Sequence, residues 1–328
     1  GVAVGVGVGY IAGKAAWRSG SAHCSPPRPI PPSDSPGQTQ SRPPRKAVRL
    51  ASTVWSPHLP TTVFVHGLES SREMWRSTLG FCAANAMPAI AVDLRGHGES
   101  DLGDPADFST DQVVDDVHEA AVATGPGKIV LVGHSMGGRV AMSYAAKYPD
   151  HVAALIIEDM DLVPRAVTAS PHGPFNRRFE TDDAAVEALR AVGYGEDRTK
   201  YWRGSRIRPL PTGGVWSDVS PESRDLAMKH VLASSDGLIA FEALGRRHAT
   251  AEGGLPFPVH VLVAGRGSAC RDPAEMTRLL PAATVHTFAE SGHSIHREAA
   301  AGFCDVLRNV VWSAAKPTAS PPPPDARL

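Results

Sequence analysis

The chain has no run of 18 or more uncharged apolar residues, so its sequence predicts no transmembrane helix. Residues 1–13 are apolar and rich in glycine and valine, but this stretch is too short to span a membrane. A secretory h-region or a short anchor is the alternative interpretation of it. Hydrophobic residues make up 42% of the chain and charged residues 20%, which is typical of a soluble globular protein.

Cysteine is scarce, and its spacing argues against two kinds of site. The four cysteines lie far apart and form no Cys-x-x-Cys pair: Cys24, Cys82, Cys270 and Cys304. A disulfide framework and a zinc site both need closer pairing. Cys82 and Cys304 fall in predicted helices and fit small core residues. The pattern is typical of a reducing compartment, and we expect neither a metal ion nor a cofactor.

A large excess of charge is also missing, because the net charge is −1. Basic residues gather in residues 1–50, which hold seven of them and one acidic residue. The remainder of the chain is therefore mildly acidic. A mildly acidic body argues against nucleic acid as a partner.

Both ends of the chain have compositions that cannot bury a core. Proline, serine, glycine and arginine dominate the second half of residues 1–46, and prolines dominate residues 316–328. We predict a disordered leader or linker at 1–46 and a disordered tail at 316–328. The leader also has the composition of a transit peptide for a mitochondrion or chloroplast, the alternative being an untargeted tail on a cytoplasmic protein. The folded domain is expected at 47–315.

Within that domain, buried strands alternate with helices. Apolar runs predict strands at residues 61–65, 88–92, 129–132, 152–157, 259–263 and 284–288, with helices between most of them. This alternation is typical of an α/β fold, a mostly parallel, doubly wound sheet covered on both faces. Ligands of such sheets bind at the carboxyl ends of the strands.

The alternation stops at about residues 163–248. Helical pieces are predicted at about 183–191 and 224–233, with an irregular basic run at 203–209 between them. We interpret the whole segment as an inserted helical lid over the strand ends.

The most informative stretch, residues 128–148, predicts a strand, a sharp turn and a helix. The turn, residues 133–137, reads Gly-His-Ser-Met-Gly, and its two glycines supply the space that a tight turn needs. Ser135 then stands at the strand end, with the backbone N–H of Met136 at a helix N-terminus. This is the nucleophile elbow of serine hydrolases.

A serine nucleophile needs a base, and His293 is the candidate. It follows Gly292 in the loop after the last predicted strand, at the same sheet edge as Ser135. His296 is the nearest competitor, but it is expected to begin the final helix. His134 is expected to pack under the elbow.

The reaction also needs donors for the oxyanion of the tetrahedral intermediate. The backbone N–H of Met136 is one predicted donor. The backbone N–H of Leu68, which follows His66-Gly67 at the end of an earlier strand, is the second. We expect His66 to brace that loop.

Two carboxylates compete for the role of orienting His293. The loop after residues 259–263 has no acid close behind its strand, and Asp272 comes late, just before a proline that predicts a helix start. Asp159 ends the strand next to the elbow strand, and its position is restricted because no loop separates it from that strand. We favour Asp159 and keep Asp272 as the alternative acid.

These motifs together resemble those of the α/β-hydrolase superfamily over about residues 47–312. They are His66-Gly67, the segment 93–100 (Asp-Leu-Arg-Gly-His-Gly-Glu-Ser), the segment 133–138 and Gly292-His293. Within it the chain looks most like the branch of alpha/beta-hydrolase domain-containing protein 11 and small bacterial acyl-ester hydrolases. That branch implies ester hydrolysis, an acid at the position of Asp159 and a mitochondrial address. The chain departs from it in the lid and in Met160, where the branch carries isoleucine followed by Ala-Pro.

The sequence therefore predicts a serine esterase that acts on a small-molecule acyl ester through an acyl-enzyme. Ser135 argues against haloalkane dehalogenases and epoxide hydrolases, which resemble this layout but use a carboxylate nucleophile. A ligand receptor with slow turnover, and a related C–C hydrolase or perhydrolase, are the alternatives.

Overall fold

The computed structural model describes residues 9–11, 49–51, 58–167, 178–191, 196, 199, 207–209, 215–217 and 221–315. The predicted tail lies outside these residues, as does the predicted leader apart from one short segment. That segment, β1 (Gly9–Ile11), pairs antiparallel with β2 (Arg49–Ala51). Tyrosine and isoleucine favour a strand in this short segment of the predicted leader.

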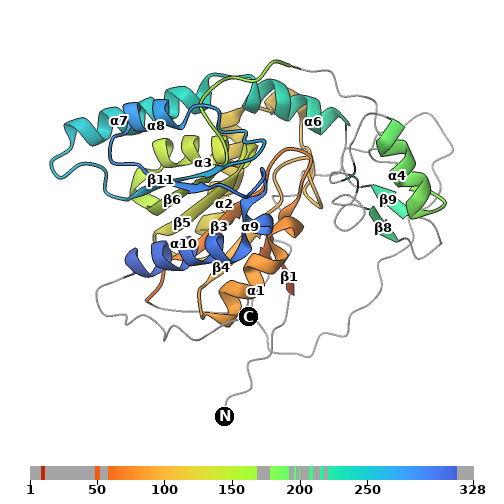
Figure 1. Cartoon of the computed structure of the whole chain (residues 1–328), viewed down its shortest axis with the longest axis horizontal. Helices are drawn as coiled ribbons and strands as arrows, with labels where there is room; N and C mark the ends of the chain where they lie inside the picture. The colour runs from red at the N-terminus through yellow and green to blue at the C-terminus, as the bar shows by residue number, and fades with distance from the viewer. Residues whose placement is uncertain are drawn as a thin grey trace, which may run out of the picture.

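A sheet of eight strands forms the centre of the described structure (Figure 1). The strand order is β1-β2-β4-β3-β5-β6-β10-β11, and the strands from β4 to β11 are parallel. The bounds of the parallel strands are Thr61–Val65 (β3), Ala89–Val92 (β4), Ile129–His134 (β5), Val152–Glu158 (β6), Val259–Ala264 (β10) and Thr284–Phe288 (β11). The predicted parallel sheet is confirmed, strand by strand.

Helices cover both faces of this sheet (Figure 1). One layer consists of α2 (Thr110–Val122), α3 (Met136–Lys147), α7 (Asp236–Thr250) and α8 (Pro273–Leu279), and the other of α1 (Arg76–Ala84) and α10 (Ala300–Ser313). Successive side chains of a strand face opposite layers. In β3, Val63 and Val65 pack with the α3 layer and Phe64 with the α1 layer. This alternation decides which residues at a strand end face the site and which face the core.

Local sequence explains where the helices begin. Helix α2 starts after Ser109, whose Oγ accepts a hydrogen bond from the backbone N–H of Gln112 at 3.1 Å. Such a cap stabilises a helix by about 1 kcal/mol. Val113 and Val117 of α2 are buried against the sheet. Burying a valine side chain contributes roughly 1.5–3 kcal/mol, so the apolar face holds the helix more firmly than its cap does.

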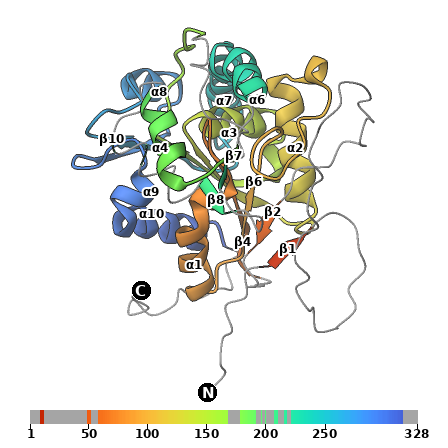
Figure 2. The ribbon, with the colours of Figure 1, turned by 90° about the vertical axis from the view of Figure 1, so that its right-hand side faces the viewer.

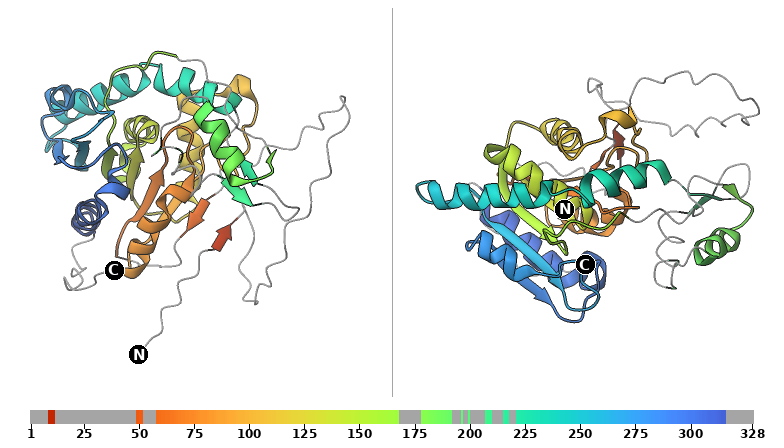
Figure 3. Two further views of the ribbon diagram at one scale, coloured as in Figure 1. Left: turned by 45° about the vertical axis from the view of Figure 1, so that its right-hand side comes forward. Right: turned by 90° about the horizontal axis from the view of Figure 1, so that it is seen from above.

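The insertion between β6 and β10 holds more than the predicted helical pieces. It contains α4 (Asp182–Ala191), α6 (Pro221–Ala227) and the π-helical turn η4 (Met228–Leu232), all near predicted positions. It also contains a small antiparallel sheet, ordered β7 (Arg178–Phe179), β9 (Val215–Ser217) and β8 (Ile207–Pro209). Figures 1 and 3 show α4 and the small sheet beside the two helical layers, and in Figure 2, which looks from that side, α4 lies in front of the main sheet. The sequence did not predict this sheet, because its strands are too short to produce a pattern.

Helix α7 differs from the prediction, which placed residues up to 248 in the lid. Phe241 and Leu244 of α7 are fully buried in the core cluster that also holds Val140 of α3. Helix α7 therefore belongs to the body of the fold. Within the described ranges, no helix is long and apolar enough to cross a membrane.

Candidate active site

Ser135 stands at a sharp turn between β5 and α3. Its backbone has φ 53° and ψ −122°, a conformation that costs a non-glycine residue on the order of 1–3 kcal/mol. A Cβ at Gly133 would lie 2.2 Å from the carbonyl oxygen of Gly137, and one at Gly137 would lie 2.4 Å from that of Val65. Only glycine fits at these two positions, as the sequence predicted. The turn presents Ser135 at the carboxyl end of the central strand β5.

The loop after β3 packs directly against this turn. A Cβ at Gly67 would lie 3.0 Å from His134 Nδ1 and 3.1 Å from Ser135 Cβ. Leu68 follows Gly67, and Met136 is the first residue of α3, where helical N–H groups have no partner within the helix. Both predicted oxyanion donors thus belong to segments that flank Ser135.

His66 braces the loop that carries Leu68. Its Nε2 accepts a hydrogen bond from the backbone N–H of Leu94 at 3.0 Å, so its Nδ1–H is the group that faces the Gly67 carbonyl oxygen, at 2.8 Å. The ring of His66 packs against that of His97, with centroids 5.1 Å apart. The expected bracing role of His66 is confirmed.

Asp159 follows β6 and reaches His293. Its Oδ2 lies 2.6 Å from His293 Nδ1, and its own backbone has a positive φ of 47°. The alternative acid, Asp272, instead caps α8, accepting a hydrogen bond from the backbone N–H of Glu275 at 3.0 Å. The structure brings Asp159 to His293 and leaves Asp272 at the helix start.

Four donors hold the Asp159 carboxylate. Besides His293, these are the Ser268 hydroxyl and the backbone N–H groups of Ala264 and Ala269, at 3.0 and 2.8 Å. Burial acts to raise the pKa of Asp159, but these hydrogen bonds outweigh it and lower the pKa to about 2. The carboxylate is therefore anionic at neutral pH. Sequence analysis missed Ser268, because one serine in an irregular loop forms no pattern.

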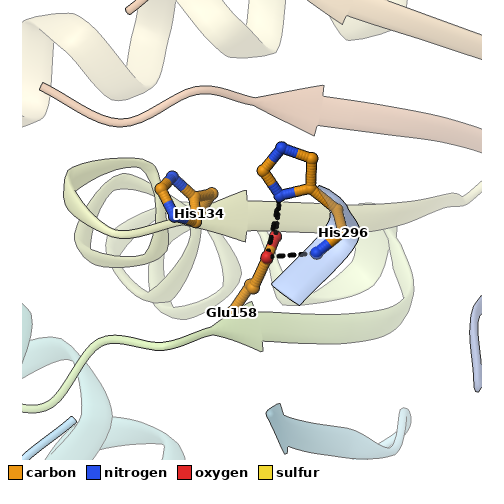
Figure 4. A group of neighbouring side chains, drawn as sticks. All are labelled: His134, Glu158 and His296. Carbon is orange, nitrogen blue, oxygen red and sulfur yellow. Dashed lines mark hydrogen bonds and ion pairs between the residues drawn. The ribbon is translucent and has the colours of Figure 1, made fainter. Parts of the chain in front are cut away.

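His134, Glu158 and His296 form a buried cluster (Figure 4). The ring of His134 lies 4.6 Å from that of His293 between centroids. Among the described residues, these three form a group that could hold a metal ion, with one ligand atom from each all within 4.8 Å of one another. Hydrogen bonds within the chain already engage them, however. Glu158 Oε1 accepts from the backbone N–H and from Nδ1 of His296, both at 2.8 Å. His134 Nε2 donates to the carbonyl oxygen of His293 at 3.0 Å.

The insertion contacts the loop of Leu68 through a buried ion pair. Arg224 of α6 donates from Nε to Glu69 Oε1 at 2.6 Å, and the two side chains are only 8% and 3% exposed. Glu69 has a positive φ of 55°. The insertion therefore fixes the residue that directly follows a predicted oxyanion donor.

The chain belongs to the α/β-hydrolase family. The family described as "alpha/beta hydrolase fold" matches residues 60–300, which include every strand from β3 to β11 and the elbow. The resemblance seen in the motifs is thus confirmed for the family.

Individual relatives are distant. Esterase Rv0045c of Mycobacterium tuberculosis is 24% identical over 81% of this chain and 87% of its own length. The sn-1-specific diacylglycerol lipase ABHD11 of Mus musculus is 25% identical over 76% of this chain and 80% of its own. A crystal structure of E-2-(acetamidomethylene)succinate hydrolase has a TM-score of 0.65 at 22% identity, covering 81% of this chain and 95% of that one. Other relatives are matched over less than half of their length, 44% and 42% for two of them.

Proposed function

We propose that the protein is a serine hydrolase that cleaves carboxylic esters of small molecules. Ser135 is the nucleophile, His293 the general base and Asp159 the residue that orients His293. The backbone N–H groups of Leu68 and Met136 form the oxyanion hole. The observation that carries the proposal is the 2.6 Å contact of Asp159 Oδ2 with His293 Nδ1, together with the strained elbow that presents Ser135.

Each group has one task in this mechanism. Asp159 accepts the Nδ1–H of His293, so that Nε2 is free of its proton and takes the proton of Ser135. Ser135 Oγ attacks the ester carbonyl carbon, and the oxyanion hole stabilises the negative oxygen that forms. His293 then protonates the departing alcohol. Water activated by His293 hydrolyses the acyl-enzyme and restores Ser135.

Two relatives support esters as the substrate class, since one is named an esterase and the other a diacylglycerol lipase. Ser135 supports acyl transfer over epoxide opening, which in this fold uses a carboxylate nucleophile. The acyl chain and the alcohol are open to experiment. A panel of acyl esters of increasing chain length, assayed for kcat/KM, identifies the preferred acyl group.

The direct test is covalent labelling with a fluorophosphonate, which an activated serine attacks at phosphorus. We expect labelling at Ser135, and we expect Ser135→Ala to abolish both labelling and ester turnover. Ser143→Ala, within the same helix α3, is the matched control and should keep both. Labelling that persists in Ser135→Ala contradicts the proposal.

Ester turnover separates this proposal from its alternatives. A ligand receptor of this fold would be labelled at Ser135 but would turn over short acyl esters far below the usual range of 1–10³ s⁻¹. A C–C hydrolase or a perhydrolase would be labelled and would prefer its own substrate over every ester in the panel.

A further inference from the structure

The residues directly before Ser135 and Asp159 face away from the site and towards the α1 layer. His134 and Glu158 are partners in the register of β5 and β6, so they lie side by side. His134 and Glu158 each lie two residues after Val132 and Ile156, so they point to the same face of the sheet as those two residues. Val132 and Ile156 pack in the core cluster of α1 and α10. The chain thus places a histidine and a carboxylate in its core, one residue from the proposed nucleophile and the proposed acid.

Both residues hold the segment that carries His293. His134 Nε2 donates to the backbone carbonyl oxygen of His293 at 3.0 Å. Glu158 binds His296, which lies three residues after His293. Its Oε1 accepts from both the backbone N–H and the Nδ1–H of His296 at 2.8 Å. Figure 4 shows His296 facing the Glu158 carboxylate with its ring and its backbone N–H. The segment is therefore pinned at His293 itself and at the start of α9 (Ile295–Glu298).

Burial and charge make this arrangement specific. Burial acts to raise the pKa of Glu158, but His296 and the hydrogen bonds that it donates outweigh it, so the pKa is lowered and the side chain is an anion. Burial lowers the pKa of His134 to about 3, so His134 is neutral beneath the ring of His293, 4.6 Å away between centroids. A neutral His134 adds no positive charge beside a base that must become a cation.

Trp75 packs against the His296 ring of this cluster. Its ring lies 4.5 Å from the ring of His296 between centroids, and both side chains are buried. His296 therefore has little freedom to turn away from Glu158. An anchor of this kind suits a loop whose histidine must keep its geometry, since a displacement of about 1 Å costs roughly a hundredfold in rate.

We propose that Glu158, His296 and His134 are positioning residues, which fix His293 between Asp159 and Ser135 without touching the substrate. The proposal rests on the proposed function, because it gives these residues a role in the same reaction. The end of β6 thus carries two carboxylates that point to opposite faces of the sheet, and each binds a histidine ring. Asp159 with His293 serves the chemistry, and Glu158 with His296 holds the loop in place.

The test compares two substitutions of nearly equal shape, His296→Asn and His296→Leu. The asparagine amide nitrogen takes the place of Nδ1 and still donates to Glu158, whereas leucine cannot. Both variants lose the ring contact with Trp75 equally. We expect His296→Leu to have a kcat about 30–100-fold below that of the wild type, with KM changed less than about threefold. We expect the kcat of His296→Asn to be at least about ten times that of His296→Leu.

The recovery of kcat by asparagine, at a nearly unchanged KM, supplies a readout that a purely structural role would not change. Unfolding in urea, measured on both variants, separates loss of stability from loss of geometry.

Each outcome decides a different point. A wild-type protein that is not labelled by a fluorophosphonate contradicts the proposed function itself. A labelled wild type whose His296→Leu and His296→Asn variants have the same kcat overturns the positioning role. Where His296→Leu fails to fold, Glu158→Met decides, since it removes both carboxylate oxygens that face the Nδ1–H of His296, at 2.8 and 3.1 Å. That variant should lose kcat in the same way, and an unchanged kcat overturns the role.

Discussion

Backbone strain at single residues is concentrated around the candidate site. Among the described residues, four non-glycine residues have a positive φ: Glu69, Ala86, Ser135 and Asp159. Three of them are the proposed nucleophile, the proposed acid and the neighbour of an oxyanion donor. Such conformations persist only where the surroundings hold them, and here the elbow, four donors and a buried ion pair do so.

The first prediction concerns the two candidate acids. Asp159→Asn presents an amide to His293 and favours the wrong tautomer, so we expect kcat to fall by about 10³–10⁴-fold. Asp272→Asn should change kcat less than about tenfold, because asparagine also caps helices and stability changes by less than about 1 kcal/mol. Steady-state kinetics and urea unfolding of both variants measure these effects. The reverse order would transfer the role to Asp272.

Residues that lie in local motifs or at the end of a predicted strand could be proposed from the sequence, but residues such as Ser268 and Glu158 could not. Ser135 and His293 lie in short patterns, Gly-x-Ser-x-Gly and Gly-His, that each describe one turn of chain. Ser268 and Glu158 lie 109 and 138 residues away from their partners along the sequence. No local pattern records such a contact.

At the scale of elements, hydrogen bonds and an ion pair join the insertion to the body, beside the apolar packing of η4 in the core. Arg224 of α6 binds Glu69, and the Thr110 hydroxyl at the start of α2 donates to the carbonyl oxygen of His230 at 2.7 Å. The insertion is thus fastened both to the loop of Leu68 and to the α2 helix. Helix α6 of the insertion therefore supports the loop that carries Leu68.

The second prediction tests that support. Arg224→Met removes the guanidinium that binds the buried Glu69 carboxylate at 2.6 Å, and breaking a buried ion pair costs about 3–5 kcal/mol. We expect that loss in urea unfolding, and a kcat about tenfold lower because the N–H of Leu68 shifts. Adding Glu69→Gln should recover more than about 1 kcal/mol in a double-mutant cycle. The control, Arg308→Met, breaks an exposed pair with Asp305 and should cost less than about 0.5 kcal/mol.

The elements of the sheet were predictable because most of the parallel strands are rich in apolar, β-branched residues and are bounded by polar or turn-forming ones. The insertion was less so, for two physical reasons. The strands β7, β8 and β9 hold two or three residues each, too few for any periodicity. Helix α7 has a clear apolar face, but only the packing of Phe241 and Leu244 against α3 shows that it belongs to the body.

Across the whole molecule, several histidines are held neutral. Burial lowers the pKa of each of these: His118, His134, His151, His260 and His286. For His260 the pKa falls to about 4, with the nearby His286 adding to the effect of burial. In the unfolded chain the same side chains titrate near pH 6.5.

The third prediction follows from these shifts. A histidine with a lowered folded-state pKa contributes stability that is present above pH 6.5 and is lost as the pH falls towards its folded pKa. We therefore expect the free energy of unfolding to decrease below pH 6.5, by about 1.4 kcal/mol per pH unit for each proton taken up. Urea unfolding from pH 7.5 to 4.5 measures the slope, and His260→Gln should reduce it. A flat profile from pH 7 to 5 would contradict this.

The adjacent placement of Glu158 and Asp159 also determines which mutations β6 tolerates. Side chains alternate along a strand, so inserting or deleting one residue in Val152–Ile157 turns the whole strand end over. The core would then receive Asp159, and the substrate side would receive Glu158. Exchanges of one apolar residue for another leave that order intact. We therefore expect the functional variants in a library of β6 to contain many substitutions and no insertion or deletion. The site depends on the face of the sheet to which each side chain at the strand end points.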